Sequence, residues 1–489
     1  MTDLANLRVL SVVSEIFPLV KTGGLADVTG ALPLALREHG VGTVSLVPGY
    51  PSVLAALKEA ETVHAFDQLF GGPARILSAR VAGHDLLVIE ARHLFDRPGN
   101  PYFDAEGRDW PDNALRFGAL GWVAARVALG DIPKFQPDIV HCHDWQAGLT
   151  LAYLAYDGRG RPPSIITVHN LAFQGLFPYE TLSALQLPPS SFQVDGVEFY
   201  GHVSFLKAGL QFADRITTVS TTYAAEMQTP EHGFGLDGLL RARSGLVTGI
   251  VNGIDTEIWN PKTDSRLPAR FDPKTIAKRA RNKQHVQRHF RLNLEPEPLL
   301  FGIVSRLAWQ KGLDILADAV PSLLDMGAQL AVLGAGEAEL ERRFFALAEA
   351  HPGRIGCIIG YNEDLAHLMQ AGADSIAVPS RYEPCGLTQL CALRYGAIPV
   401  VAKVGGLADT VLDPLEIASG RARATGFHFS PVTREALEAA LARTRDLWSR
   451  QPEWRRMQRS GMRTDVSWTK SARQYADVYR DLLANASVR

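Results

Sequence analysis

The segment 379–397 carries the residues with the clearest capacity for chemistry. Within five positions it places a cation, a carboxylate and a thiol, at Arg381, Glu383 and Cys385. A short apolar run precedes this loop and apolar residues at helical spacing follow Gly386, so the loop should join a strand to a helix. In an α/β domain such a loop lies at the carboxyl edge of the sheet, where ligands bind.

The start of the predicted helix indicates a phosphate site. The backbone N–H groups of Gly386, Leu387 and Thr388 would point from the helix N-terminus toward a phosphate. Glu383 would then be a fixed anion beside that phosphate, able to bind hydroxyl groups or to stabilise developing positive charge. On these residues alone, an ordinary strand–loop–helix turn fits equally well.

Two other strand-to-helix loops offer cations for phosphate. Lys21 precedes Gly23 and Gly24, and a glycine pair lets the backbone approach a ligand closely. A tight turn would also explain that pair. Arg306 and Lys311 flank the second loop, and two cations in this arrangement suit a diphosphate.

Sugar-binding residue types follow another strand of the first half. We expect a short strand from residue 138 to lead into a polar loop that contains His141, His143, Asp144 and Trp145. The histidine spacing does not match a standard zinc site, so a metal ion is not favoured. A carboxylate and an indole suit a sugar better, because one binds hydroxyl groups and the other covers an apolar sugar face.

Two further strands deliver polar residues to the same edge of the sheet. His169 and Asn170 follow the apolar run 164–168, and Asn252 follows the run 246–251. A histidine that emerges here beside an asparagine is a candidate functional residue rather than a structural one.

These loops belong to an alternation of apolar runs and helical patterns through the whole chain. The predicted strands are 8–13, 43–47, 164–168, 215–219, 246–251, 299–304, 331–333, 355–359, 375–378 and 398–402, with a short one from 138 and a terminal helix within 466–489. The alternation restarts after a boundary near 252–261, which predicts two doubly wound parallel-sheet domains. Residues 21–27 (KTGGLAD) and 403–409 (KVGGLAD) match at six of seven positions, so each domain would contribute a glycine-rich loop to one cleft.

Composition narrows the class of protein. The 489 residues are 46% apolar and 21% charged, with a formal net charge of −2, which argues against a protein that coats nucleic acid or anionic membrane. Seven Lys and Arg without an acid between 274 and 291 predict a solvated helix face. No apolar run is long enough to span a membrane, and the early Asp3 argues against a signal or transit peptide. Four scattered cysteines predict a reducing, cytoplasmic environment.

The assembled motifs strongly resemble the bacterial glycogen synthases and related starch synthases over nearly the whole chain. They are EIFPLVKTGGLAD (15–27), HCHDWQAGL (141–149), TVHNLAFQG (167–175), VNGID (251–255), SRLAWQKGLD (305–314), SRYEPCGLTQL (380–390) and GGLADTV (405–411). This family transfers glucose from ADP-glucose to a growing α-1,4-glucan such as glycogen.

The resemblance implies the GT-B architecture, in which two Rossmann-like domains face a deep cleft. Residues 1–252, completed by the helix 466–489, would form the acceptor-side domain, and residues 253–465 the nucleotide-sugar domain. A hinge near 252–261 and at the crossover of the terminal helix is expected, because the catalytic groups lie on both halves.

The resemblance also implies roles in donor binding. Lys21 resembles the donor-binding lysine, and Gly23 and Gly24 the loop near the donor phosphates. Arg306 and Lys311 resemble the pair that neutralises the ADP leaving group.

Further donor contacts are implied in the second half. Glu383 and Cys385 would line the glucose pocket, the amides of 386–388 would face the diphosphate, and Tyr361 is similar to the residue near adenine. The wider GT-B pattern places a second glutamate eight residues after the first, where this chain has Cys391. This departure is typical of the synthases and leaves ribose recognition unassigned.

Asp144, His169 and Asn252 fall where the family places residues around the reacting sugar. The family retains anomeric configuration, so we expect the acceptor hydroxyl to attack from the leaving-group face and to give its proton to the departing phosphate. His169 would support the oxocarbenium-like state. A double displacement with Asp144 as the nucleophile is the alternative. No Asp-x-Asp pair occurs, so neither a metal nor another cofactor is expected.

Three other functions fit the sequence less well. A GT-B transferase that uses UDP-glucose or a small acceptor is the nearest, and the KTGGLAD motif argues against it. A nicotinamide oxidoreductase would need a GxGxxG fingerprint after the first strand, which the chain lacks there. A non-catalytic sugar-binding protein would not need Lys21, Arg306, Lys311 and Glu383 together.

Overall fold

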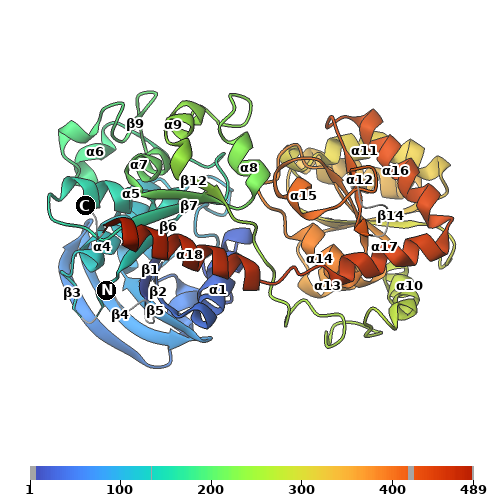
Figure 1. Ribbon diagram of the computed structural model, residues 1–489, viewed down its shortest axis with the longest axis horizontal. Helices are drawn as coiled ribbons and strands as arrows, with labels where there is room; N and C mark the ends of the chain where they lie inside the picture. The colour runs from blue at the N-terminus through green and yellow to red at the C-terminus, as the bar shows by residue number, and fades with distance from the viewer. Residues whose placement is uncertain (1–6, 134, 417–422, 487–489) are drawn as a thin grey trace. The chain divides into compact units, whose positions relative to one another are not determined.

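The computed structural model describes residues 7–133, 135–416 and 423–486. The chain forms two compact units, which Figure 1 shows from the blue N-terminal to the red C-terminal end. Unit 1 comprises Met1–Asn252 together with Trp468–Arg489, and unit 2 comprises Gly253–Ser467.

Unit 1 is built on a mainly parallel sheet of order β12-β11-β7-β6-β1-β2-β5-β4-β3 in the described residues. Its strands are β1 (Leu7–Val12), β2 (Val41–Pro48), β3 (Ala60–Leu69), β4 (Gly72–Val81), β5 (His84–Glu90), β6 (Ile139–His143), β7 (Ser164–Val168), β11 (Arg215–Thr218) and β12 (Val247–Gly249). The strands from β12 to β5 pair in parallel, and the edge pairs β5–β4 and β4–β3 are antiparallel. β6 and β7 are buried along their whole length, as expected for strands covered on both faces.

Helices cover this sheet, and a small second sheet accompanies it. The helices are α1 (Gly24–Leu36), α2 (Pro51–Ala56), α3 (Arg92–Phe95), α4 (Asn113–Ala128), α5 (Asp144–Tyr156), α6 (Thr181–Ala184), α7 (Phe205–Phe212), α8 (Thr221–Glu226), α9 (Asp237–Ala242) and α18 (Thr469–Ala486). The small sheet has the order β8 (Leu176–Pro178), β10 (His202–Ser204), β9 (Glu198–Phe199). The C-terminal helix α18 belongs to unit 1, where Trp468, Tyr475 and Tyr479 are buried in one apolar cluster with residues of β1 and α1.

Unit 2 is built on a parallel sheet of order β15-β14-β13-β16-β17-β18 in the described residues. Its strands are β13 (Leu300–Val304), β14 (Gln329–Gly334), β15 (Ile355–Ile359), β16 (Ser375–Val378), β17 (Ile398–Ala402) and β18 (Phe427–Phe429). Its helices are α10 (Arg279–His289), α11 (Leu313–Asp325), α12 (Ala338–Ala350), α13 (Glu363–Gly372), α14 (Thr388–Tyr395), α15 (Gly405–Thr410), α16 (Arg434–Trp448) and α17 (Gln451–Arg463).

Both sheets contain a point at which the strand order reverses. In unit 2 the first strand, β13, lies between β14 and β16, which is the Rossmann order. In unit 1 the first strand, β1, lies between β2 and β6. Ligands of doubly wound sheets bind beyond the carboxyl ends of the strands at such a reversal, so the loops after β1 and β6, and after β13 and β16, are the expected sites. The prediction of two doubly wound α/β sheets is confirmed.

Two local predictions are wrong. His141 and His143 lie on β6, and Asp144 is already the first residue of α5, so the polar loop expected there does not exist. The basic segment 274–291 is only partly solvated, because Arg279 and Lys283 are buried. The Arg279 guanidinium donates to the carbonyl of Ala373, and Lys283 Nζ donates to backbone carbonyls and lies 2.7 Å from an Asp374 carboxylate oxygen.

None of the helices in the described ranges combines the length and apolar content needed to cross a bilayer.

Candidate functional site

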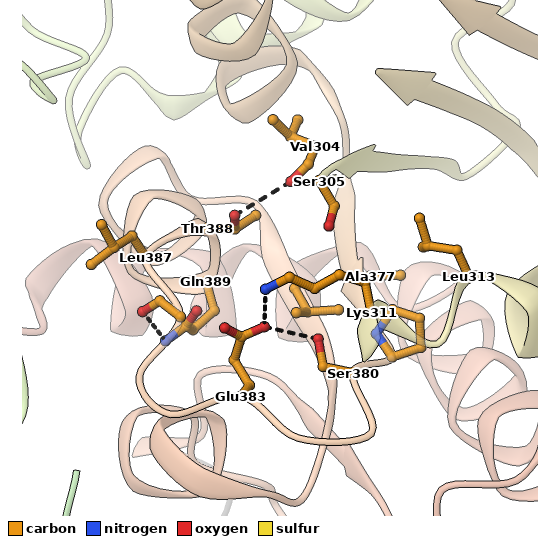
Figure 2. Close-up of a pocket in the computed structure, with 13 residues that line it drawn as sticks. Val304, Ser305, Lys311, Leu313, Ala377, Ser380, Glu383, Leu387, Thr388 and Gln389 are labelled. Carbon is orange, nitrogen blue, oxygen red and sulfur yellow. Dashed lines mark hydrogen bonds and ion pairs between the residues drawn. The ribbon is translucent and has the colours of Figure 1, made fainter. Parts of the chain in front are cut away.

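A pocket lies at the strand reversal of unit 2. The ends of β13 and β16 form one part of it, and the loop that leads into α14 forms the other (Figure 2). Its lining residues are Val304, Ser305, Lys311, Leu313, Ala377, Val378, Pro379, Ser380, Glu383, Gly386, Leu387, Thr388 and Gln389. The pocket therefore lies where the topology of a doubly wound sheet places its ligand.

Glu383 is the charged centre of this pocket. Its side chain is buried, and its Oε2 accepts hydrogen bonds from Lys311 Nζ at 2.6 Å and from Ser380 Oγ at 2.9 Å (Figure 2). A buried carboxylate needs a paired cation and hydrogen-bond donors, and these two neighbours supply both. The sequence predicted Lys311 and Glu383 as site residues, whereas the bond between them and the part played by Ser380 were not predicted.

An ion pair joins the loop that carries Glu383 to the first turn of α11, which follows Lys311. The Arg381 guanidinium binds both carboxylate oxygens of Asp314 at 2.6 Å, donates to the Trp309 carbonyl at 2.7 Å and lies 4.4 Å from the centre of the Trp309 ring. Bidentate pairs of this kind fix geometry as well as adding energy. Arg381 is thus a positioning residue of the loop rather than a pocket residue.

Arg306 lies outside the buried part of the pocket. Its side chain is exposed, and its Nη2 is 3.4 Å from the Gln310 side-chain oxygen. An exposed guanidinium on the loop after β13 is accessible to an anion.

The first turn of α14 borders the pocket. Among the residues that the structure describes, no side chain caps this helix end at Leu387. The Gln389 side-chain amide instead donates to the carbonyls of Cys385 and Gly386, at 2.9 and 2.8 Å, and so holds the loop that precedes the helix. The amides of Gly386, Leu387 and Thr388 therefore border the pocket, while Cys385 itself is buried.

Tyr361 lies at the end of β15 and is 75% exposed. Its hydroxyl donates to the Glu363 carboxylate. The ring is therefore held at its tip and open on its faces.

In unit 1 the loop after β1 is organised by Glu15, which the sequence reasoning missed. This carboxylate is 2% exposed and accepts hydrogen bonds from the Thr22 N–H, from Thr22 Oγ1 at 2.6 Å and from the Tyr102 hydroxyl at 2.5 Å. Lys21 is exposed and pairs with Asp27 at 2.8 Å, and the glycines at 23 and 24 are exposed as well. A carboxylate directly after the first strand was the signal that could have identified Glu15.

Asp144 is held at the reversal point of unit 1 with a left-handed backbone, at a φ of 55°. Its Oδ1 accepts the backbone N–H groups of His169 and Asn170, at 2.6 and 3.4 Å. Burial raises the pKa of this carboxyl to about 7. The side chain thus joins the start of α5 to the residues that follow β7.

Three histidines lie beside it. Nδ1 of His143 is 3.0 Å from Nε2 of His169, and the ring of His143 stacks on that of His141. Burial lowers the pKa of His141 and of His169 to about 3 and that of His143 well below its usual range. All three rings are therefore neutral near pH 7.

The remaining predicted site residues of unit 1, Trp145 and Asn252, are less accessible to a ligand. Trp145 packs edge-on against Phe117 at 4.9 Å, and a Cβ on Gly175 would lie 2.3 Å from its ring, so much of the indole is covered by protein. Asn252 is buried, and its Oδ1 has no hydrogen-bond partner in the ranges the structure describes.

No group of three or more His, Cys, Asp or Glu side chains in the described part of the chain could hold a metal ion.

Comparisons with known proteins cover both units. Residues 8–242 match the family described as starch synthase catalytic domain, and residues 286–460 match glycosyl transferases group 1. The chain is 60% identical over 481 residues to a glycogen synthase of Rhodopseudomonas palustris, covering 98% of each chain. It is 56% identical over 480 residues to a glycogen synthase of Methylocella silvestris, covering 98% of this chain and 99% of that one. Among solved structures, it resembles the catalytic domain of starch synthase IV from Arabidopsis thaliana bound to ADP and acarbose, with a TM-score of 0.87 and 30% identity over 98% of this chain and 100% of that one.

Proposed function

The chain belongs to the glycogen synthase family, and from that premise we propose how its residues carry out the transfer. It is a glucosyltransferase of GT-B architecture that uses ADP-glucose. We assign the donor's diphosphate and glucose to the pocket of unit 2 and the groups that act around the acceptor to unit 1.

The observation that carries the donor assignment is the Lys311–Glu383 pair at the strand reversal of unit 2. Glu383 is fixed by Lys311 and Ser380, so its second oxygen is presented in a defined direction. In the proposal that oxygen binds glucose hydroxyl groups. Lys311, the exposed Arg306 and the amides at the start of α14 bind the diphosphate.

The same groups would lower the barrier to cleavage of the sugar–phosphate bond. Negative charge grows on the diphosphate as this bond breaks, and donors already aimed at it stabilise that charge without reorganisation. Lys21 in unit 1 is proposed to add a further positive charge to the donor, and Tyr361 to contact the adenine.

For the acceptor we propose attack from the leaving-group face, with the hydroxyl proton passing to the departing phosphate. His169 and Asn252 would contact the reacting sugar. The Asp144 carboxylate accepts backbone N–H groups at the end of β7, so we propose that it positions His169 rather than forming a covalent intermediate.

The test of the donor is incorporation of labelled glucose into glycogen from ADP-glucose and from UDP-glucose, with and without a chelator. Strong transfer from ADP-glucose that survives the chelator supports the cationic diphosphate site. Preference for UDP-glucose contradicts the donor assignment and leaves the fold unaffected. An Arg306→Gln variant that keeps its full rate would contradict the role of Arg306.

The variant Asp144→Asn tests the mechanism. An asparagine oxygen can still accept the His169 N–H but cannot attack the sugar, so we expect the rate to fall no more than about tenfold. Loss of a covalent nucleophile would lower the rate by on the order of 10⁶-fold. Single-turnover transfer distinguishes the two, with Asp195→Asn, a change outside both proposed sites, as the control.

The same variant tests the burial of Asp144. Its pKa rises from 3.8 to about 7 on folding, so the neutral form stabilises the protein fully below pH 3.8 and this stabilisation is lost as pH rises toward 7. The loss is on the order of 4 kcal/mol. We expect the unfolding free energy of the wild type, measured relative to that of Asp144→Asn, to fall between these pH values; a constant difference would contradict the raised pKa.

A further inference from the structure

A chain of buried contacts runs from the C-terminal helix α18 to His169. The Tyr479 hydroxyl of α18 is 2.8 Å from Nδ1 of His141, and Nε2 of His141 is 2.6 Å from the Thr167 hydroxyl. His141 is therefore bonded through both ring nitrogens and cannot rotate. Figure 1 shows α18, in red, lying along unit 1, where β6 carries His141.

His143 stands between this fixed ring and His169. Its ring stacks on His141 with centroids 4.1 Å apart and an angle of 30°, and it stacks on His169 at 5.3 Å and 28°. Its Nδ1 is 3.0 Å from Nε2 of His169. His143 is 1% exposed, so the contact between the two rings is shielded from water.

We propose that His143 is a positioning residue for the transfer reaction, which fixes both the orientation and the tautomer of the His169 ring. The proposal rests on the function proposed above for His169 and adds the group that controls it.

The way in which His143 sets the tautomer of His169 follows from the number of protons between the two rings. Two neutral imidazoles that share one N–H···N hydrogen bond have a single proton between the two facing nitrogens. If His143 Nδ1 carries it, His169 Nε2 accepts and the other nitrogen of His169, Nδ1, is an N–H donor. If His169 Nε2 carries it, Nδ1 of His169 is an acceptor. The bond from His143 thus decides whether His169 offers the sugar a donor or an acceptor.

Burial favours the neutral form of both rings, which this hydrogen bond requires. Charging either ring would place an uncompensated cation in the interior, and accordingly burial lowers the pKa of both rings. The Asp144 carboxylate binds the backbone N–H groups of His169 and Asn170 through its Oδ1. Orientation of His169 therefore depends on a neutral hydrogen bond, which one side-chain change can remove.

The matched variants are His143→Leu and His143→Asn. Leucine has a similar size but no hydrogen-bonding atom, whereas asparagine places a polar atom near the position of Nδ1. We expect His143→Leu to lower kcat by about 10- to 100-fold, the range for a misoriented catalytic group, with the KM for ADP-glucose within about twofold of wild type. His143→Asn should recover most of kcat. His289→Leu, an exposed histidine of unit 2, is the control.

Nitrogen-15 spectra of the histidine-labelled wild type give a second test that needs no variant. They should show one protonated nitrogen between His143 Nδ1 and His169 Nε2, with both rings neutral. Two protonated or two unprotonated facing nitrogens would overturn the proposal. So would equal kcat values for His143→Leu and wild type, or an equal loss for the Leu and Asn variants.

The outcomes separate this proposal from the one on which it rests. A wild type without transfer activity contradicts the proposed function, and an active His169→Ala contradicts the role of His169. An inactive His169→Ala together with a fully active His143→Leu contradicts the positioning role alone.

Discussion

Two stretches of the molecule share six of seven residues, and each begins a helix, but they differ in burial and in the backbone conformation of their glycines. Residues 21–27 (KTGGLAD) follow β1 in unit 1, and residues 403–409 (KVGGLAD) follow β17 in unit 2. In the first stretch the glycines are exposed, Gly23 has an extended backbone and a Cβ there would meet nothing within 4 Å. In the second, Gly405 is buried at a φ of 42°, and a Cβ on it would lie 2.0 Å from the Glu383 carbonyl oxygen.

The buried copy supports the loop that carries Glu383, which is proposed to bind the donor. The Gly406 N–H donates to the carbonyls of Glu383 and Pro384, at 3.1 and 3.0 Å, and this approach is possible only without a side chain. The exposed copy leaves its two glycines accessible to solvent. Nearly the same seven residues therefore begin a helix in each unit. They are exposed in unit 1, where we propose that they bind the donor, and buried in unit 2, where they support the loop that carries Glu383.

The one differing position explains much of the contrast. Thr22 donates its N–H and its hydroxyl to the buried Glu15, which draws the loop toward β1. Val404 has no polar side-chain atom and is 8% exposed in the apolar core of unit 2. A polar residue fixes the loop at the surface, and an apolar one carries it into the core.

Alanine substitutions of the glycines should give the largest effect and test whether the two copies differ in role. Gly406→Ala places a Cβ 2.2 Å from the Cys385 carbonyl oxygen, so the loop that carries Glu383 must move. We expect about 1–3 kcal/mol of destabilisation and about 100-fold slower transfer. Gly23→Ala should change the unfolding free energy by less than about 0.5 kcal/mol, as surface changes do. Thermal unfolding of both variants measures the change in stability, and transfer assays of Gly406→Ala measure the slower rate. Equal losses of stability in the two variants would show that the two copies do not differ in role.

Sequence reasoning located eleven strands of the two main sheets and their exits because those signals are local, but it did not predict β3, β4, β5 and β18. Apolar runs marked β1, β13 and β16, and the polar residues after them followed from the strand ends. The contacts that make the sites are not local: Glu383 pairs with Lys311, 72 positions away, and Glu15 with Tyr102, 87 positions away. No spacing within either loop encodes such a partner.

Two other differences have local physical causes that the sequence concealed. The left-handed backbone at Asp144 lets α5 begin directly after β6. The presence of an aspartate does not by itself predict a left-handed conformation. Arg279 and Lys283 look like surface residues, but their apolar stems are buried and their charged ends reach carbonyls or a carboxylate inside unit 2. For Arg279 and Lys283, residue type alone predicts an exposed side chain.

Glutamine substitutions of the two matching lysines should give the next largest effect on transfer. Lys21 is proposed to act on the donor, whereas Lys403, the matching residue of the second copy, pairs with Glu416 at 3.0 Å. We expect Lys21→Gln to lower kcat/KM for ADP-glucose by about 10- to 100-fold, because a charge near the diphosphate is lost. Lys403→Gln should stay within about twofold, since an exposed ion pair contributes little. If initial rates over a range of ADP-glucose concentrations changed equally in both variants, the division of roles would be wrong.

The smallest effect tests the differing position by exchange. Thr22→Val removes the hydroxyl that donates to Glu15 at 2.6 Å but keeps the backbone N–H bond. The ordered conformation of the loop is then less stable by about 1 kcal/mol. Transfer should slow several-fold while the unfolding temperature changes little. Val404→Thr buries a hydroxyl in the core of unit 2 and should cost about 1–3 kcal/mol of stability. Its donor loop is held by backbone bonds from Gly406, so the rate at low temperature should be preserved. Denaturant unfolding and rates at 10 °C distinguish the two variants. If Thr22→Val destabilised the fold more than Val404→Thr, the hydroxyl would serve the core of unit 1 rather than the loop, and the contrast between the copies would need another cause.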